Sequence, residues 1–394
     1  MSTLTIAIVV VFIIGYACIA MESFTKVNKA AVALLMFVGC WTLFMMDPGS
    51  YITEVSGDGL LAKVNEIIEA HLGSTSTTLF FLMGAMTIVE IVDQNGGFNF
   101  VRNALRTTSK RKLLWRIMIL SFFLSAILDN MTTSIVMVMV LRKLVEEKHD
   151  RMMYASLVII AANSGGAFSP IGDVTTIMLW NKSLITSGGV ITEIFIPSLV
   201  SAVIPTLILQ FMMKGELKVP ENKESSEADE LTNSQRNTIF CLGVGGLVFV
   251  PIFRYLTDLP PFVGILLILG ILWLTTELFY AQLAEHTSPM SKRVSNLLSR
   301  IDMSTILFFL GILMAVSCLE EVGVLSLTGE WLNQVSAGNH YVVTGAIGVI
   351  SSIVDNVPLV AGCMGMYTNL VGDFACDGLF WQLLAYCAGV GGSI

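Results

Sequence analysis

The sequence predicts an all-α polytopic membrane protein with two inverted-topology repeats, each containing a re-entrant hairpin and a broken transmembrane helix. Three observations lead to this prediction: the composition, the division of basic residues among the links between apolar segments, and an internal repeat. Hydrophobic residues occupy 54% of the 394 positions and charged residues only 13%, which lies outside the range of soluble domains. Helices are expected because lipid offers the backbone no hydrogen-bond partners.

The apolar segments, taken in order, set the expected helices. Several reach the ~17 to 25 residues that a helix needs to cross a hydrocarbon core of ~30 Å. The first has no basic residue ahead of it, so we interpret it as a membrane helix and not as a secretory signal. The seven cysteines contain no CxxC pair and are expected to pack between helices. The expected segments cover residues 4–20, 30–46, 78–92, 113–144, 154–181, 192–213, 238–253, 262–280, 305–323, 342–367 and a last one from about 379.

The links between these segments separate by charge. Five links contain 19 of the 22 lysines and arginines, and the positive-inside rule places such links in the cytoplasm. The other links are acidic or uncharged and are expected outside, so that the N-terminus is periplasmic in a bacterial inner membrane. The five basic links are residues 21–29, 93–116, 142–151, 214–237 and 281–304.

Residues 113–144 form one long apolar segment with basic residues at both ends. A single span cannot begin and end on the same side, so we interpret this segment as a re-entrant hairpin that enters from the cytoplasm. Its expected arms, about 113–128 and 133–144, are too short to span at ~1.5 Å per residue. Its tip contains Asp129 and Asn130.

A second long segment, residues 342–367, is interrupted by Asp355, Asn356 and Pro358. The links on both sides of it are acidic or uncharged. It is therefore expected to be a hairpin that enters from outside, opposite in direction to the first.

The two hairpins also match each other in sequence. The stretch Ser125–Asn130 (SAILDN) lies 226 positions before Ser351–Asn356 (SSIVDN), and Ala162–Gly166 recurs as Ala388–Gly392 at the same offset. Because the hairpins open on opposite sides, the halves are predicted to be inverted repeats, an architecture of secondary transporters. The predicted organisation is a first repeat at 1–213, a polar cytoplasmic linker at 214–237, and a second repeat at 238–394 that is incomplete because it stops inside its broken helix.

Asp129 and Asp355 are the residues that most need an explanation. A charged carboxylate deep in a membrane costs ~2.5 to 3.5 kcal/mol on insertion scales and persists where it lines a cavity or finds a partner. One interpretation is structural, with each aspartate capping the second arm of its hairpin. The other is a cation site of carboxylate, amide and hydroxyl oxygens, in which sodium is favoured over calcium because each cluster has one evident carboxylate.

A third carboxylate, Asp173, follows the first repeat's glycines. The stretch Asn163-Ser164-Gly165-Gly166 is expected to break the helix and free backbone carbonyl groups for an ion. Asp173 is then either the N-cap of the following half-helix, or an ion-site residue together with Thr175 and Thr176, or both. A carboxylate in a low-dielectric site holds a proton more readily than in water and releases it when a cation arrives, which predicts exchange of sodium for protons.

The paired Ser-x-x-x-Asp-Asn tips and the stretch Asn163–Thr176 resemble the D-type bacterial sodium/proton antiporters (NhaD) of the ion transporter superfamily. In sodium-coupled carboxylate carriers of that superfamily serine precedes the asparagine, where this chain has Asp129 and Asp355. The resemblance implies a homodimer, activity at alkaline pH for pH homeostasis, and lithium as an accepted substitute for sodium. It also implies one ion site of Ser125, Asp129, Asn130 and the Gly165 region, with Asp173, Thr175 and Thr176 beside it, and a second of Ser351, Asp355, Asn356, Gly391 and Ser393.

Two other functions remain open on the sequence. A sodium-coupled organic-anion symporter could use the same fold, although an acidic side chain at each hairpin tip would repel its substrate. An intramembrane aspartyl protease could share a proton between two aspartates, but hydrolysis has no use for an inverted repeat. We therefore expect a transporter and not an enzyme. Its expected partners are the lipid bilayer and small cations, with no cofactor and no nucleic acid.

Overall fold

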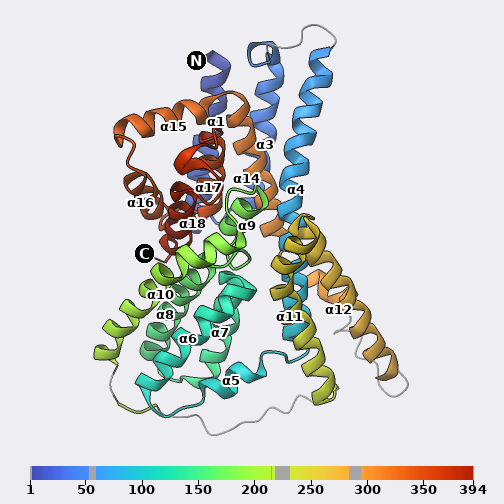
Figure 1. Ribbon diagram of the computed structural model, residues 1–394, viewed down its shortest axis with the longest axis vertical. Coiled ribbons are helices and arrows are strands. Elements are labelled where there is room, and N and C mark those ends of the chain that lie inside the picture. The colour runs from blue at the N-terminus through green and yellow to red at the C-terminus, as the bar shows by residue number, and fades with distance from the viewer. Residues whose placement is uncertain (1, 53–58, 214, 218–230, 284–293, 394) are drawn as a thin grey trace. The chain divides into compact units, whose positions relative to one another are not determined.

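The computed structural model describes residues 2–52, 59–213, 215–217, 231–283 and 294–393, and these residues are almost entirely helical (Figure 1). Seven of the helices are long and apolar enough to cross a membrane. No strand occurs in the described ranges, where the only extended pairing is an isolated bridge between Ser109 and Glu216. The prediction of a polytopic helical membrane protein is confirmed.

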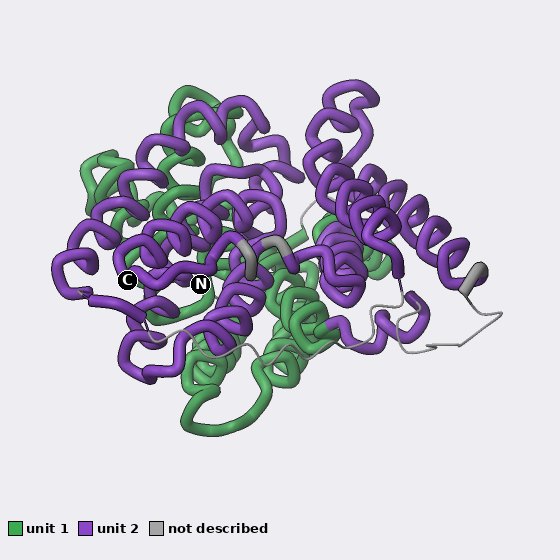
Figure 2. The backbone as a smooth tube through the Cα atoms, turned by 90° about the horizontal axis from the view of Figure 1, so that it is seen from below, with its two compact units in different colours: residues 1–80, 302–392 green, residues 81–301, 393–394 purple. Residues whose placement is uncertain are grey.

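The chain divides into two compact units, coloured separately in Figure 2. Unit 1 consists of residues 1–80 and 302–392, and unit 2 of residues 81–301 with 393–394. Each unit contains one of the two hairpins. The units do not share limits with the predicted repeats, because α4 (Gly59–Gln94) begins in unit 1 and ends in unit 2.

Unit 1 is held together by close helix crossings. In addition to the start of α4, it contains α1 (Thr3–Ala20), α2 (Glu22–Thr25), α3 (Lys29–Met46), η1 (Pro48–Ser50), α14 (Met303–Glu321), α15 (Val324–Val335), α16 (His340–Ser351), α17 (Asn356–Met366), η4 (Gly372–Phe374) and α18 (Leu379–Gly391). A Cβ atom at Gly311 of α14 would collide with the backbone of Ala33 in α3. Beside that crossing, the indole N–H of Trp41 donates to the Met314 carbonyl oxygen at 2.8 Å. Small residues let helices approach where lipid supplies no hydrophobic drive for association.

Unit 2 also has close helix crossings at glycines. Besides the end of α4, its helices are α5 (Asn99–Leu105), α6 (Lys110–Leu128), α7 (Asn130–Leu144), α8 (Lys148–Ala167), α9 (Val174–Asn181), α10 (Ser187–Met212), α11 (Asn233–Thr257), α12 (Pro261–Leu283), α13 (Val294–Leu297) and η3 (Leu298–Arg300). Gly165 of α8 lies directly on the backbone of Phe122 in α6, and Gly246 of α11 lies on Ile268 of α12. Larger side chains at these glycines would force the helices apart.

The first hairpin breaks at Asp129 as predicted, but its arms differ from the expected limits. Helix α6 begins at Lys110, three residues early, because the Ser109 hydroxyl accepts a hydrogen bond from the backbone of Lys112 and caps the helix. Its 19 residues correspond to about 28 Å, longer than the expected arm, and it is not among the seven helices that are long and apolar enough to cross a membrane. Helix α7 starts at Asn130 because Asp129 itself caps it.

The second hairpin fits its expected dimensions. Its arms α16 and α17 contain 12 and 11 residues, or about 18 and 17 Å, which is shorter than a hydrocarbon core of ~30 Å. The two helices are separated at residues 352–355 and lie together with α18 in unit 1.

The helix over residues 154–181 is broken, but later than predicted. Helix α8 continues through Asn163–Gly166 to Ala167, and the non-helical connection is residues 168–173. The glycines stay helical because they provide the close crossing with α6. Pro170 lies in the connection, where its missing N–H and its fixed φ do not interrupt a helix. The carbonyl groups without intrahelical partners therefore belong to the last turn of α8.

Two predicted links contain helices. Helix α15 occupies most of the expected link 324–341, and α4 extends back from the apolar run 78–92 into the link 47–77. Most of the predicted linker 214–237 lies outside the described residues, apart from 215–217 and the start of α11. That start carries a capping box between Thr232 and Gln235.

Candidate functional site

The first cluster lies in unit 2, where α6 ends and α7 begins. Asp129 has φ 83° and ψ 159°, a combination that is essentially restricted to glycine. Its carboxylate accepts hydrogen bonds from the backbone N–H and the hydroxyl of Thr132, both at 2.8 Å. The capping interpretation of Asp129 is thus realised, in a backbone conformation that costs about 1–3 kcal/mol.

Asn130 connects three segments of unit 2. Its amide nitrogen donates to Oδ1 of Asn163 at 2.9 Å and to Oδ2 of Asp173 at 3.0 Å. The hairpin tip, the last turns of α8 and the start of α9 therefore meet at one amide group. The sequence predicted that all three residues belong to the site, and the structure brings them together.

Asp173 is the N-cap of α9 and is 1% exposed. Its Oδ1 accepts from the backbone N–H of Thr175 at 3.0 Å and from the Thr175 hydroxyl at 2.9 Å. A buried carboxylate needs such donors, and the N-terminal end of a helix adds favourable electrostatics. The cap expected for Asp173 is present in the structure, and the Asp173 carboxylate lies beside Asn130.

Backbone groups of unit 2 come close beside these side chains. The Ser125 hydroxyl donates to the carbonyl oxygen of Ala162 at 2.6 Å, and the Ser169 hydroxyl donates to that of Ala126 at 2.5 Å. A Cβ atom at Gly172 would collide with the Ser125 carbonyl oxygen. The connection between α8 and α9 is thereby fastened to the end of α6.

Two hydroxyl groups close to this cluster in sequence are buried without a hydrogen-bond partner in the described part of the chain. They are Oγ of Ser164, next to Asn163, and Oγ1 of Thr176, next to Thr175. Both residues are 0% exposed. Buried polar groups in native proteins are nearly always hydrogen-bonded, so oxygens of this kind suit a ligand that brings its own positive charge.

The second cluster lies in unit 1. Asp355 caps α17 through the backbone N–H of Val357 at 3.1 Å, and Asn356 opens the helix as Asn130 opens α7. The Ser351 hydroxyl donates to the Ala388 carbonyl oxygen at 2.9 Å. Gly391 ends α18, and Ser393 falls beyond the end of unit 1.

The two clusters repeat the same contacts at the offset seen in the sequence. The hydrogen bond from Ser125 to Ala162 in unit 2 corresponds to that from Ser351 to Ala388 in unit 1. Gly165 lies on the backbone of Phe122, and 226 positions later Gly391 lies on that of Gly348. The repeated motif therefore builds the same serine hydrogen bond and the same glycine crossing twice.

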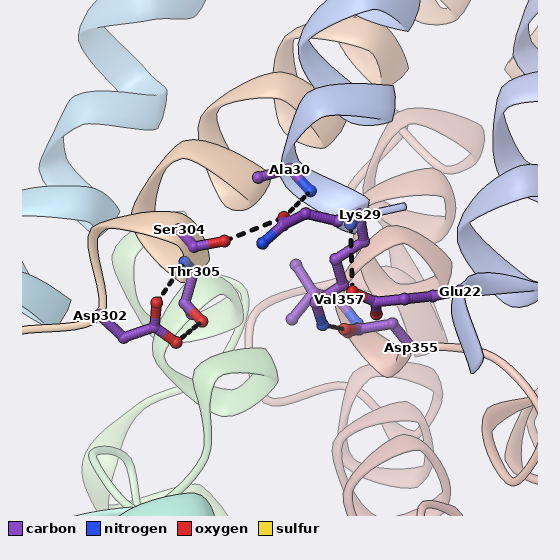
Figure 3. A network of polar contacts seen from close by, with 9 residues as sticks. Glu22, Lys29, Ala30, Asp302, Ser304, Thr305, Asp355 and Val357 are labelled. Carbon is purple, nitrogen blue, oxygen red and sulfur yellow. Dashed lines mark hydrogen bonds and ion pairs between the residues drawn. The ribbon is translucent and has the colours of Figure 1, made fainter. Parts of the chain in front are cut away.

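A lysine that sequence reasoning missed distinguishes the second cluster. Nζ of Lys29 lies 3.0 Å from Oδ2 of Asp355 (Figure 3), and it stands 4.2 Å from the ring centroid of Phe308. The backbone N–H of Lys29 donates to Glu22 at 3.2 Å. In the sequence, Lys29 contributes only to the basic link 21–29. No local pattern connects it to an aspartate 326 positions away.

Two further ion pairs involve histidine and glutamate side chains. Nε2 of His71 lies 2.7 Å from Oε1 of Glu321 in unit 1. In unit 2, Glu90 pairs with Arg300 at 3.8 Å. These pairs lie away from the two hairpin tips in sequence.

A protein-family model described as "Citrate transporter" (CitMHS) matches residues 8–391, almost the whole chain. The chain belongs to the CitMHS family. Sodium/proton antiporter 1 of Arabidopsis thaliana is 41% identical over 99% of this chain, which spans 65% of that relative's length. Sodium/proton antiporter 2 of the same plant is 38% identical over 97% of the chain and 87% of its own length.

Bacterial relatives confirm the expected resemblance to NhaD. The Na(+)/H(+) antiporter NhaD of Vibrio cholerae is 28% identical over 100% of this chain and 83% of its own length. The family description names citrate, whereas these relatives are named for sodium and protons. Membership of the CitMHS family therefore establishes a membrane transporter and leaves the cargo to be argued from the site.

Proposed function

We propose that this protein is a secondary transporter that exchanges sodium for protons across a bacterial inner membrane. The observation that carries the proposal is the meeting of Asn130, Asn163 and Asp173 in unit 2, directly after Asp129 in the chain. Relatives that are 28% to 41% identical and named sodium/proton antiporters support the same cargo.

The chemistry of this cluster suits a small monovalent cation. Its groups are hard oxygen donors, namely carboxylates and amide carbonyls, and the buried hydroxyls of Ser164 and Thr176 are next in sequence to Asn163 and Thr175. Among the described residues no lysine or arginine pairs with Asp129. A sodium or lithium ion would supply the charge that these oxygens lack, and we propose Asp129 and Asn130 as its principal ligands.

Exchange follows from competition for one carboxylate. A carboxylate that is removed from water holds a proton more readily than in solution. A cation that arrives at Asp129 displaces the proton, and a proton that binds after transport displaces the cation. One group can thus carry both ions in opposite directions without a separate proton pathway.

The matched contacts of the two hairpins support a proposed inverted repeat. Secondary transporters of this type bind substrate at broken helices and alternate between two orientations. We propose that α6 with α7 and α16 with α17 are re-entrant hairpins that enter from opposite sides, with the N-terminus in the periplasm.

The experiment that tests the function uses everted vesicles from an antiporter-deficient bacterium with a respiration-driven proton gradient and a pH-sensitive dye. Sodium addition should collapse the gradient for the wild type and not for Asp129→Asn. Asp258→Asn is the matched control, because Asp258 also has a positive φ, 56°, and ends α11 at an exposed position. Exchange that survives in Asp129→Asn would contradict the proposed site.

A sodium-coupled organic-anion symporter is the second candidate, because the family description names citrate. The carboxylates of Asp129 and Asp173 would repel such a substrate. Sodium-dependent uptake of labelled citrate by the same vesicles, without sodium-driven proton movement, would support symport and contradict sodium/proton exchange.

A further inference from the structure

The two hairpin tips, which match in sequence, differ in charge. In unit 2 both carboxylate oxygens of Asp129 accept hydrogen bonds from Thr132, and no described lysine or arginine pairs with them. In unit 1 one oxygen of Asp355 accepts from Val357 and the other receives the ammonium group of Lys29 at 3.0 Å. One tip therefore has a cation of its own, and the other has none.

Lys29 is held in position toward Asp355 by several contacts (Figure 3). Its ammonium group lies over the face of Phe308, 4.2 Å from the centroid, an attractive cation–π arrangement. Asn28, just before it, accepts hydrogen bonds from Ala30 at 2.8 Å and from the Ser304 hydroxyl at 3.0 Å. The start of α3 is thus fastened to the start of α14 directly beside the ion pair.

The position of Lys29 is unfavourable for its own helix. It is the first residue of α3, where the partial positive charge of the helix N-terminus repels a cation. Asn28 already caps that helix. The charge of Lys29 is therefore not explained by helix stability, and its favourable partner in the described chain is Asp355, whose side chain is 21% exposed.

We propose that Lys29 is the resident counter-cation of Asp355, so that the second hairpin holds an ammonium group in place of a transported sodium ion. This inference rests on the proposed function and refines it: sodium binds at the Asp129 cluster alone. It replaces the expectation from the sequence that Asp355 and Asn356 form a second sodium site. Lys29 acts as a positioning residue, since it sets the number of cation sites through the carboxylate that it occupies.

The test counts sodium sites on the purified full-length chain by equilibrium binding of radioactive sodium at one fixed pH. The wild type should bind one sodium ion per chain, and Asp129→Asn should bind none. Lys29→Met vacates Asp355 and should raise the number to two, and the added Asp355→Asn change should return it to one. Lys29→Arg keeps the charge and should leave the number at one.

A Lys29→Met protein that still binds one sodium ion would overturn the inference without affecting the proposed function. Sodium binding that persists in Asp129→Asn and disappears in Asp355→Asn would overturn the inference and also the proposed site at Asp129. Failure of the wild type to bind or exchange sodium would instead overturn the proposed function.

The double variant Lys29→Met/Asp355→Asn covers the case in which Lys29→Met does not fold, because it replaces the ion pair by two neutral side chains. It should retain one sodium site with the wild-type affinity, and loss of that site would contradict the inference.

Discussion

At the scale of single residues, the conformation of Asp129 is the least expected feature of the protein. A non-glycine residue at φ 83° and ψ 159° is strained, although a glycine at this position would be comfortable. The aspartate is kept at a cost to the fold, which is the pattern expected of a residue that works on a ligand. Capping alone does not explain it, since glycine is nearly as good an N-cap.

Replacing Asp129 by glycine should therefore stabilise the protein while abolishing sodium exchange. The relief of strain, about 1–3 kcal/mol, exceeds the few tenths lost when glycine replaces a capping side chain. Asp129→Ala keeps the strain and loses the cap, so it should unfold at a lower temperature than the wild type. Thermal unfolding in detergent measures both, and equal melting temperatures for the two variants would contradict the assignment of strain.

Asn130 offers a second residue-scale prediction, because its two hydrogen bonds differ in strength. Asn130→Ala removes the donor to the charged Asp173, a bond worth about 1.5–3 kcal/mol, as well as the neutral bond to Asn163. The sodium concentration for half-maximal exchange should rise about 10- to 100-fold.

Asn163→Ala loses only the neutral bond, worth about 0.5–1.5 kcal/mol, and should raise that concentration only a few-fold. Dye-based exchange assays over a sodium series would measure both variants. A larger effect for Asn163→Ala would show that the charged bond is not the important one.

At the scale of helices, glycine crossings hold each hairpin to its broken helix. Gly165 faces a carbonyl group of Phe122, which is backbone and cannot rotate away. This explains why the glycines of α8 remain helical instead of breaking the helix. Near the C-terminal end of α6, Gly172 packs against the Ser125 carbonyl oxygen in the same way.

Gly165→Ala should lower the stability of unit 2 by at least the 1–3 kcal/mol typical of an overpacked contact, and exchange should fall with it. Gly270→Ala is the control, because nothing lies within 4 Å of a Cβ atom at Gly270 in α12 and alanine is the better helix former. Chemical or thermal unfolding compares the two. A tolerated alanine at Gly165 would mean that α6 and α8 separate more easily than the structure indicates.

At the scale of the whole molecule, the charge distribution predicts how the chain enters the membrane. Green fluorescent protein inserted between residues 215 and 217 should fluoresce, since that link carries basic residues and belongs in the cytoplasm. Alkaline phosphatase inserted there should be inactive, whereas the same enzyme between α15 and α16 should be active. The opposite pattern of activities would invert the proposed topology.

Much of the architecture could be predicted because it depends on local sequence. Apolar length located the helices, and the 226-residue offset located two matching hairpin tips, whose serines make equivalent hydrogen bonds in the structure. Helix limits were less accurate, as the start of α6 and the end of α8 illustrate. Those limits depend on a serine cap and on a glycine crossing with another helix, and a hydropathy pattern contains neither.

The sequence by itself determined that this chain is a helical membrane protein and that its motif occurs twice, and it predicted one candidate site from Asp129, Asn130 and Asp173. Only the tertiary structure decided that the two tips are not equivalent. The pairing of Lys29 with Asp355 joins residues 326 positions apart, through the packing of α3 against α14 and of α14 against α17 in unit 1. Composition and periodicity report what each segment prefers, whereas a charge pair between distant segments exists only once packing has placed their ends side by side.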